Sequence, residues 1–151
     1  MKTRTFLVGG LLVGGGAVLS HWLGSRPETE AQGSPLPALR GAPNGYASAP
    51  LRLAAPPRRV RSLVRVSLDH GGLYPLYGTP ESVTPTEHGF DVVVALGPFR
   101  DDLSLAILPD GAGSAVWARS ASRVGRTDLG VNRLRTRRLL ADIERRVASA
   151  S

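Results

Sequence analysis

Serine, arginine, aspartate and asparagine side chains crowd together in the stretch RSASRVGRTDLGVNRLR, residues 119–135. The motif FRDD adds two adjacent carboxylates a short way upstream. Arginine beside paired carboxylates can carry acid–base chemistry on an anionic substrate, or can simply hold an anion. The candidate functional or structural constellation comprises Asp101, Asp102, Arg119, Ser120, Ser122, Arg123, Asp128, Asn132 and Arg135.

The sequence lacks the motifs of common catalytic and cofactor sites. Ser120 and Ser122 are the obvious nucleophiles, but neither lies in a GxSxG elbow or near a histidine in sequence, although a histidine could approach in space. The chain has no cysteine, and His21, His70 and His88 lack metal-ligand spacing. The turn DGAGS lacks the GK[ST] ending of a phosphate loop. We therefore predict no metal and no cofactor.

The candidate residues must be positioned by a small set of helices and strands. The segment RRVRSLVRVSLDHGG (58–72) spaces its apolar residues for a helix and has Gly71 as a C-cap. Val64, Val66 and Leu68 also alternate, so a strand is the alternative. We favour the helix, because the segment follows two prolines that suit a helix start.

Further along the chain, a hairpin and a second helix are predicted. β-Branched and apolar runs predict strands at 89–97, 103–108 and 115–122, with a weaker one around 74–84. VNRLRTRRLLADIERRVAS predicts a helix with apolar residues on one face and arginines on the other. Asn132 is its expected N-cap, with Asp128 adding negative charge nearby. The sum is an α+β fold, a small antiparallel sheet of three to four strands packed against two helices.

The predicted hairpin also has a predicted register. With the turn PDGAGS centred on residues 111–112, paired residue numbers sum to about 223. Asp101 then lies opposite Ser122, and Asp102 lies opposite Ala121. A slip of one residue in the turn would exchange the two faces of the sheet.

Strand alternation separates the side chains of the last strand into two sets. Arg119 and Arg123 face one side, and Ser120 and Ser122 face the other. Arg119 and Arg123 become diagonal neighbours of FRDD and lie within reach of a carboxylate. The sequence therefore predicts an Asp–Arg network that links FRDD to RSASR, with Asp128 as a further member.

The N-terminal segment FLVGGLLVGGGAVLSHWL has no charge and is long enough, at about 27 Å of helix, to span a bilayer. Lys2 and Arg4 precede it, so the N-terminus is expected in the cytoplasm and the remainder outside. A cleaved signal peptide, which would leave a periplasmic or secreted chain, is the alternative. The predicted parts are a membrane anchor or signal segment at 1–24, a Pro/Gly-rich flexible linker or stalk at 25–40, and a small α+β domain at 41–151.

The formal net charge of +7 is concentrated toward the C-terminus. Residues 119–151 carry nine basic and three acidic side chains. Few aromatic residues accompany these arginines, and the expected location is outside the cytoplasm, so nucleic acid is not an expected partner. The expected partners are the membrane, through the N-terminal segment, and an anionic ligand or envelope protein.

The stretch RSASRVGRTDLGVNRLR resembles the signature of an uncharacterised family catalogued as domain of unknown function 1499, found in bacteria and plastid-bearing organisms. The Asp pair of FRDD matches a pair in that family, and APNGYAS (42–48) resembles its Pro-Asn-Cys segment, with Gly45 in place of the cysteine. Ser104 stands where the family often has Glu, and this weakens the interpretation of the Asp pair as part of a three-carboxylate metal site. The resemblance covers about residues 41–148. It implies a shared fold, but it implies no particular reaction.

Two classes of function fit the sequence. The favoured one is a membrane-tethered extracytoplasmic binding or structural module, in which the Arg/Asp/Asn constellation is a fold joint or an anion cradle. The alternative is a small cell-envelope enzyme that uses Asp101, Asp102 and Arg123 on an anionic substrate. A catalytic aspartate would line a concave site and be partly unsatisfied, whereas a closed Asp–Arg network would indicate a structural role.

Overall fold

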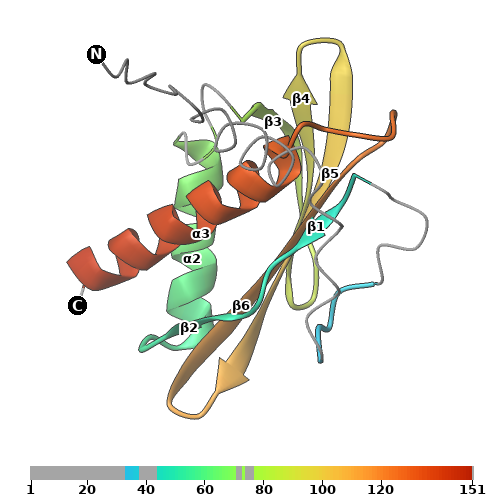
Figure 1. Cartoon of the computed structure of the whole chain (residues 1–151). Coiled ribbons are helices and arrows are strands. Elements are labelled where there is room, and N and C mark those ends of the chain that lie inside the picture. Colours follow the sequence, from blue (N-terminus) through green and yellow to red (C-terminus); the bar gives the residue numbers. More distant parts are fainter. Residues whose placement is uncertain (1–32, 38–43, 71–72, 74–76, 151) are drawn as a thin grey trace, which may run out of the picture.

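The computed structural model describes residues 33–37, 44–70, 73 and 77–150. In this part of the chain, six strands form one antiparallel sheet and two helices cover one of its faces (Figure 1). In chain order the elements are β1 (Tyr46–Ala47), β2 (Leu51–Leu53), α2 (Pro57–Asp69), β3 (Thr79–Pro85), β4 (Gly89–Leu96), β5 (Phe99–Asp110), β6 (Gly113–Ser122) and α3 (Val131–Ser149). The predicted α+β fold with two helices packed on an antiparallel sheet is confirmed.

The sheet is larger than the three to four strands predicted. Its order is β1-β6-β5-β4-β3, and β2 also pairs with β6. The additional strands β1 and β2 are only two and three residues long, too short for alternation to show in a sequence that is rich in proline. They form because the backbone of β6 provides hydrogen-bond partners for them, so they depend on the tertiary structure.

The edge strand β3 explains why its sequence signal is weak. Pro80 and Pro85 both lie in it, and the pairing with β4 shifts register between Pro80 and Ser82. Proline is tolerated at a sheet edge and at a bulge because the missing N–H is not needed there. The strand predicted around 74–84 is present as 79–85, and residues 74–76 lie outside the described part of the chain.

The β5–β6 hairpin has the predicted register. Asp110 pairs with Gly113, and Gly111 takes a positive φ of 58° in the turn between them. Asp101 lies opposite Ser122 and Asp102 opposite Ala121, as the turn sequence predicts. The tight turn fixes the pairing of the two longest strands, so it also decides which residues face the helices.

Helix α2 is a helix rather than the alternative strand. Proline occupies its first position, where the absent N–H is not needed. Val60, Val64 and Leu68 are buried, and they lie on one face at helical spacing. The helix ends at Asp69, and His70 is its C-cap, with a backbone N–H that donates to the carbonyl of Val66. Gly71, the C-cap expected from the sequence, lies outside the described residues.

Helix α3 differs from its prediction in two ways. Asn132 is not the N-cap: Gly130, with a positive φ of 82°, occupies that position, and Asn132 lies inside the first turn. Arg135 does not lie on a solvated face, because it is fully buried against the sheet. A helix that docks over polar residues buries whichever side chains can bond to them, and hydropathy alone does not mark such a position.

Helices α2 and α3 are joined by a second polar contact. Asp142 of α3 is buried and accepts hydrogen bonds from Ser67 Oγ of α2 (2.8 Å), Arg145 Nη2 (2.5 Å) and Arg146 Nε (2.7 Å). Burial by itself would raise the pKa of Asp142. The hydrogen bonds from Arg146, Ser67 and Arg145 outweigh burial and hold that pKa below its ordinary value of 3.8.

The hydrophobic core lies between the sheet and the two helices. It includes Val60, Leu73, Leu103, Val116 and Ile143, each fully buried. No helix among the described residues is long and apolar enough to cross a membrane. The segment predicted to do so, 1–24, and most of the predicted linker, 25–40, lie outside those residues.

Candidate functional site

The two adjacent aspartates of β5 point to opposite faces of the sheet. Asp101 faces the helices, is 3% exposed, and pairs with Arg135 of α3. Asp102 faces the open side of the sheet, which carries no helix, and pairs with Arg123. Because a strand sends neighbouring side chains in opposite directions, these two carboxylates cannot act on the same atom.

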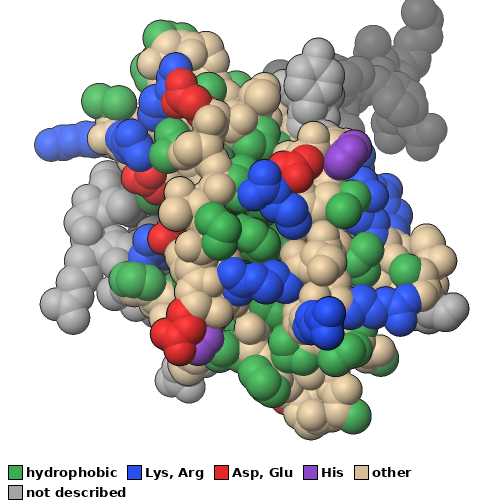
Figure 2. Space-filling view, turned by 180° about the vertical axis from the view of Figure 1, so that it is seen from behind, with side chains coloured by type: hydrophobic (Ala, Val, Ile, Leu, Met, Phe, Trp, Pro, Cys, Tyr) green, Lys and Arg blue, Asp and Glu red, His purple; other side chains and the backbone are tan. Residues whose placement is uncertain are grey.

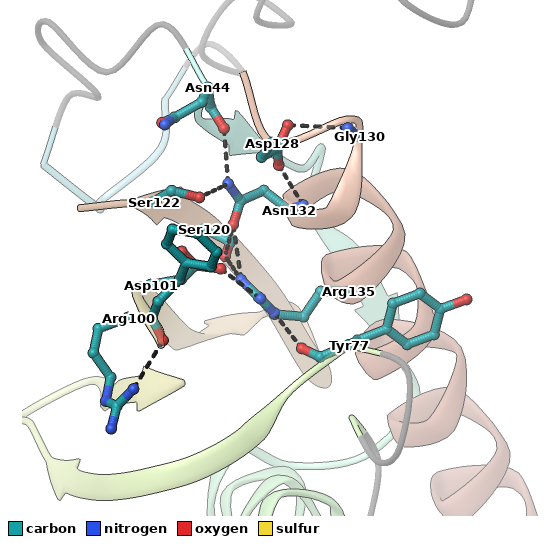
Figure 3. A network of polar contacts seen from close by, with 11 residues as sticks. Asn44, Tyr77, Arg100, Asp101, Ser120, Ser122, Asp128, Gly130, Asn132 and Arg135 are labelled. Carbon is teal, nitrogen blue, oxygen red and sulfur yellow. Dashed lines mark hydrogen bonds and ion pairs between the residues drawn. The ribbon is translucent and has the colours of Figure 1, made fainter. Parts of the chain in front are cut away.

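Arg135 is the centre of the buried site (Figure 3). Its Nη2 donates to Asp101 Oδ2 over 2.6 Å, and its Nε donates to the carbonyl oxygen of Tyr77 over 2.7 Å. Its Nη1 donates to Ser120 Oγ (2.9 Å) and to Asn132 Oδ1 (2.8 Å). All three nitrogens of the fully buried guanidinium therefore have acceptors, as a buried cation requires.

Asn132 connects the same site to the start of the sheet. Its Oδ1 accepts from Ser120 Oγ over 2.6 Å, and its Nδ2 donates to Ser122 Oγ (3.1 Å) and to the backbone carbonyl of Asn44 (2.8 Å). Asn44 in turn donates from Nδ2 to the carbonyl of Gly125 over 2.9 Å. The amide of Asn132 thus holds β6, α3 and the chain before β1 together.

Asp128 belongs to the site as a helix cap. Its Oδ1 accepts from the backbone N–H of Gly130 (3.0 Å) and its Oδ2 from that of Asn132 (2.5 Å). These N–H groups open α3 and would otherwise lack acceptors. The predicted position of Asp128 near this helix terminus is confirmed, but Asp128 makes no ion pair with a described residue.

We call this group the Arg135 network: Asn44, Asp101, Ser120, Ser122, Asp128, Asn132, Arg135 and the carbonyl of Tyr77. It joins the loops before β1 and β3 to β5, β6 and α3 (Figure 3). Buried ion pairs and amide networks of this kind are costly to break, because the partner left behind is desolvated and unpaired.

The remaining candidate residues lie on the open face. Arg123 donates from Nη2 to Asp102 Oδ1 over 2.7 Å, and both side chains are about half exposed. The hydrogen bond to Asp102 raises the pKa of Arg123. Arg119 donates to the carbonyl of Pro37 and forms no ion pair with a described carboxylate. The predicted Asp–Arg network is therefore two separate pairs, and only Asp102 has the predicted arginine.

Asn44 and Tyr77 belong to the network but not to the constellation predicted from the sequence. Tyr77 contributes only a backbone carbonyl, which no side-chain pattern can indicate. Asn44 lies within APNGYAS, the segment whose family resemblance the sequence already showed. Asn44 belongs to the network because the segment before β1 passes the end of β6, where its backbone carbonyl accepts a hydrogen bond from the buried Asn132.

Two concavities lie beside these residues. The end pocket, at the end of the sheet beside the loop after β6, has a volume of about 470 Å³. Asp101 and Ser122 line it together with five apolar side chains, Leu96, Phe99, Val124, Leu129 and Val131. The open-face groove has a volume of about 560 Å³, and Asp91, Asp102, Ser104 and Arg119 line it beneath residues 35–37.

Charges and possible metal ligands are dispersed over the described part of the molecule. Lys and Arg side chains on the face in Figure 2 form several separate groups, some of them beside acidic side chains. On α3, Arg145 and Arg146 pair with Asp142. No group of three or more His, Cys, Asp or Glu side chains within the described ranges could hold a metal ion.

Comparison with known proteins identifies the family. The model of the family described as "Protein of unknown function (DUF1499)" matches residues 42–143. The chain belongs to the DUF1499 family. The DUF1499 match includes every residue of the Arg135 network, from Asn44 to Arg135.

The other comparisons add no activity to the DUF1499 assignment. Among curated proteins there is no match. Among solved structures, the crystal structure of TTHA0849 from Thermus thermophilus is similar to this chain at 19% sequence identity and a TM-score of 0.42. That similarity covers 71% of this chain and 99% of the other.

Proposed function

We propose that this DUF1499 protein is a membrane-tethered extracytoplasmic binding module, and that the Arg135 network is the joint that holds its fold together. The observation that carries the fold joint is the burial of Arg135, which is 0% exposed and donates to Asp101, Ser120, Asn132 and the Tyr77 carbonyl. A guanidinium enclosed in this way has no face left for an anion. The fold joint is therefore favoured over the anion cradle.

The arrangement of carboxylates favours binding over catalysis. An enzyme with an Asp pair would need both groups at one cleft, but Asp101 and Asp102 lie on opposite faces of the sheet. No histidine contacts the Arg135 network, so Ser120 and Ser122 have no adjacent base among the described residues. The end pocket and the open-face groove are two concave surfaces of the described part of the chain that can receive a ligand.

The tether rests on the N-terminal sequence. FLVGGLLVGGGAVLSHWL is uncharged and follows Lys2 and Arg4, which favours a span with its N-terminus in the cytoplasm. Membrane attachment through this segment and an extracytoplasmic domain are accordingly part of the proposal, with cleavage of the segment as the alternative.

Unfolding experiments test the fold joint. In the full chain, Arg135→Ala and Asp101→Ala should each lower stability by about 3–5 kcal/mol, and the double variant should cost little more than one of them. The matched control is Arg123→Ala, which breaks the half-exposed pair with Asp102 and should leave the Tm almost unchanged. Thermal unfolding followed by tryptophan fluorescence, to which Trp117 in β6 contributes, measures the Tm of each variant. If Arg135→Ala is no worse than Arg123→Ala, the network is not a fold joint.

Cysteine labelling tests the tether, since the chain has no cysteine of its own. Ser149→Cys should react with a membrane-impermeant maleimide in intact cells, whereas Thr3→Cys should react only after permeabilisation. Loss of Thr3→Cys from the mature chain would instead show cleavage. Reaction of Ser149→Cys only after permeabilisation would contradict the extracytoplasmic location.

A further inference from the structure

Most of the large apolar side chains that are exposed in the described part of the chain lie around the end pocket. Phe99, Val124 and Leu129 are 56%, 65% and 64% exposed, and all three line this pocket. Val66, on α2, is the one other exposed large hydrophobic residue in the described part of the chain. Apolar side chains gathered around one concavity indicate a site for an apolar ligand, because single exposed hydrophobic residues are usually scattered.

The backbone is strained at Leu129, in the wall of the pocket. Leu129 has a φ of 54°, and it is the only non-glycine residue with a positive φ in the described part of the chain. A leucine in this conformation costs about 1–2 kcal/mol. Thr127 Oγ1 accepts a hydrogen bond from the Leu129 N–H, and the neighbouring cap by Asp128 fixes the loop. Strain of this kind is concentrated at ligand sites.

The inner wall of the pocket is polar and incompletely bonded. Asp101 Oδ2 is used by Arg135, but Asp101 Oδ1 has no hydrogen-bond donor among the described residues, although the residue is 3% exposed. Ser122 Oγ accepts from Asn132 Nδ2, and its own hydroxyl hydrogen has no acceptor among those residues. An acceptor and a donor therefore line the same small space.

A hydroxyl group matches this pair of atoms better than other head groups. It donates one hydrogen and keeps lone pairs to accept another, so it can bond to Asp101 Oδ1 and Ser122 Oγ at once. A carboxylate has no hydrogen to donate and would lie beside two carboxylates, Asp101 and Asp128. An ammonium can donate to both oxygens, but it would place a second cation beside the Arg135 guanidinium, which already pairs with Asp101, and an apolar pocket disfavours that extra charge.

We propose that the end pocket binds a neutral apolar alcohol. Its hydroxyl lies between Asp101 Oδ1 and Ser122 Oγ, and its hydrocarbon body packs against Phe99, Val124 and Leu129. The volume of about 470 Å³ is that of a small-molecule site. This inference rests on the proposed function, since it names the ligand class of the binding module.

Photo-crosslinking of the full chain in phosphatidylcholine vesicles tests the ligand class. The probes are a long-chain alcohol, acid and primary amine that carry a diazirine at the same carbon. The alcohol should label peptides covering residues 96–131, and excess unlabelled alcohol should suppress that labelling. The acid and the amine should label these peptides about tenfold less, because a carboxylate has no hydrogen for Asp101 Oδ1 and an ammonium would add a second desolvated cation beside Arg135. Equal labelling by the acid or the amine, or labelling that no competitor suppresses, would overturn the proposal.

Variants locate the label in the pocket. Phe99→Ser combined with Leu129→Ser should lower alcohol labelling about tenfold through lost apolar contact. Val66→Ser is the matched control and should leave labelling unchanged, because Val66 lies on α2 and does not line the pocket. Equal labelling of the two variants would overturn the site. A failure of these experiments alone refutes the alcohol site, whereas the proposed function is decided separately by unfolding and cysteine labelling.

Discussion

Three polar side chains are buried in the first two turns of α3. Asn132, Arg135 and Thr136 are all 0% exposed, where an amphipathic helix would usually carry apolar residues. Hydrogen bonds to partners on β5 and β6 compensate the desolvation of Asn132 and Arg135. Thr136 Oγ1 is buried and has no hydrogen-bond partner among the described residues. A buried hydroxyl without a partner lowers stability, because its desolvation is not compensated.

Thr136→Val should therefore leave the free energy of unfolding unchanged or raise it by up to about 1 kcal/mol. The matched control is Ser120→Ala, because Ser120 Oγ bonds to both Asn132 and Arg135. Loss of that bonded hydroxyl should cost about 1–3 kcal/mol. Denaturant unfolding measures both variants. A loss at Thr136→Val as large as that at Ser120→Ala would show that its hydroxyl is satisfied.

At the scale of elements, the start of α3 depends on one carboxylate. Asp128 accepts from the N–H groups of Gly130 and Asn132, and no other described side chain caps the helix. Asp128→Ala should lower stability by about 0.5–2 kcal/mol, as for other N-terminal caps. Asp69→Ala removes an exposed i,i+4 pair with Arg65 and should have a much smaller effect. Urea midpoints compare the two, and equal shifts would contradict the capping role.

The contact between α2 and α3 should depend on pH through Asp142. Its pKa is held below the ordinary value of 3.8, so the contribution to stability is present above about pH 4. It is lost as the pH falls below that value toward the folded-state pKa, because protonation removes the acceptor for Arg146 and Arg145. In Asp142→Asn this loss should disappear from the stability profile between about pH 5 and pH 2. An unchanged acid slope in that variant would contradict the assignment.

At the scale of the whole molecule, stability should fall from the centre of the sheet to its edge. β5 lies between β4 and β6 and has a buried run from Leu103 to Ile107, whereas β3 is an edge strand with mostly exposed side chains. Amides in β5 should therefore exchange with solvent only on global unfolding, and those in β3 through local opening. Native-state hydrogen exchange checks this. Equal protection of β3 and β5 would show a single cooperative unit.

Local geometry explains which features could be predicted from the sequence. The turn around Gly111 sets the register of β5 and β6, and the alternation of side chains then separates Ser120 and Ser122 from Arg119 and Arg123. The helical spacing of Val60, Val64 and Leu68 likewise depends only on neighbouring residues. These predictions concern residues joined by a short stretch of chain, so the sequence pattern contains the relevant geometry.

The α+β class, the hairpin register and most residues of the Arg135 network follow from local sequence patterns. The pairing of these residues depends on how the elements dock: Asp101 pairs with Arg135, Asp102 with Arg123, and Asn132 with Asn44. The docking of α3 on the sheet selects these partners, and it depends on the packing of the whole core. The short strands β1 and β2 have the same cause, because they form on β6 and have no pattern of their own.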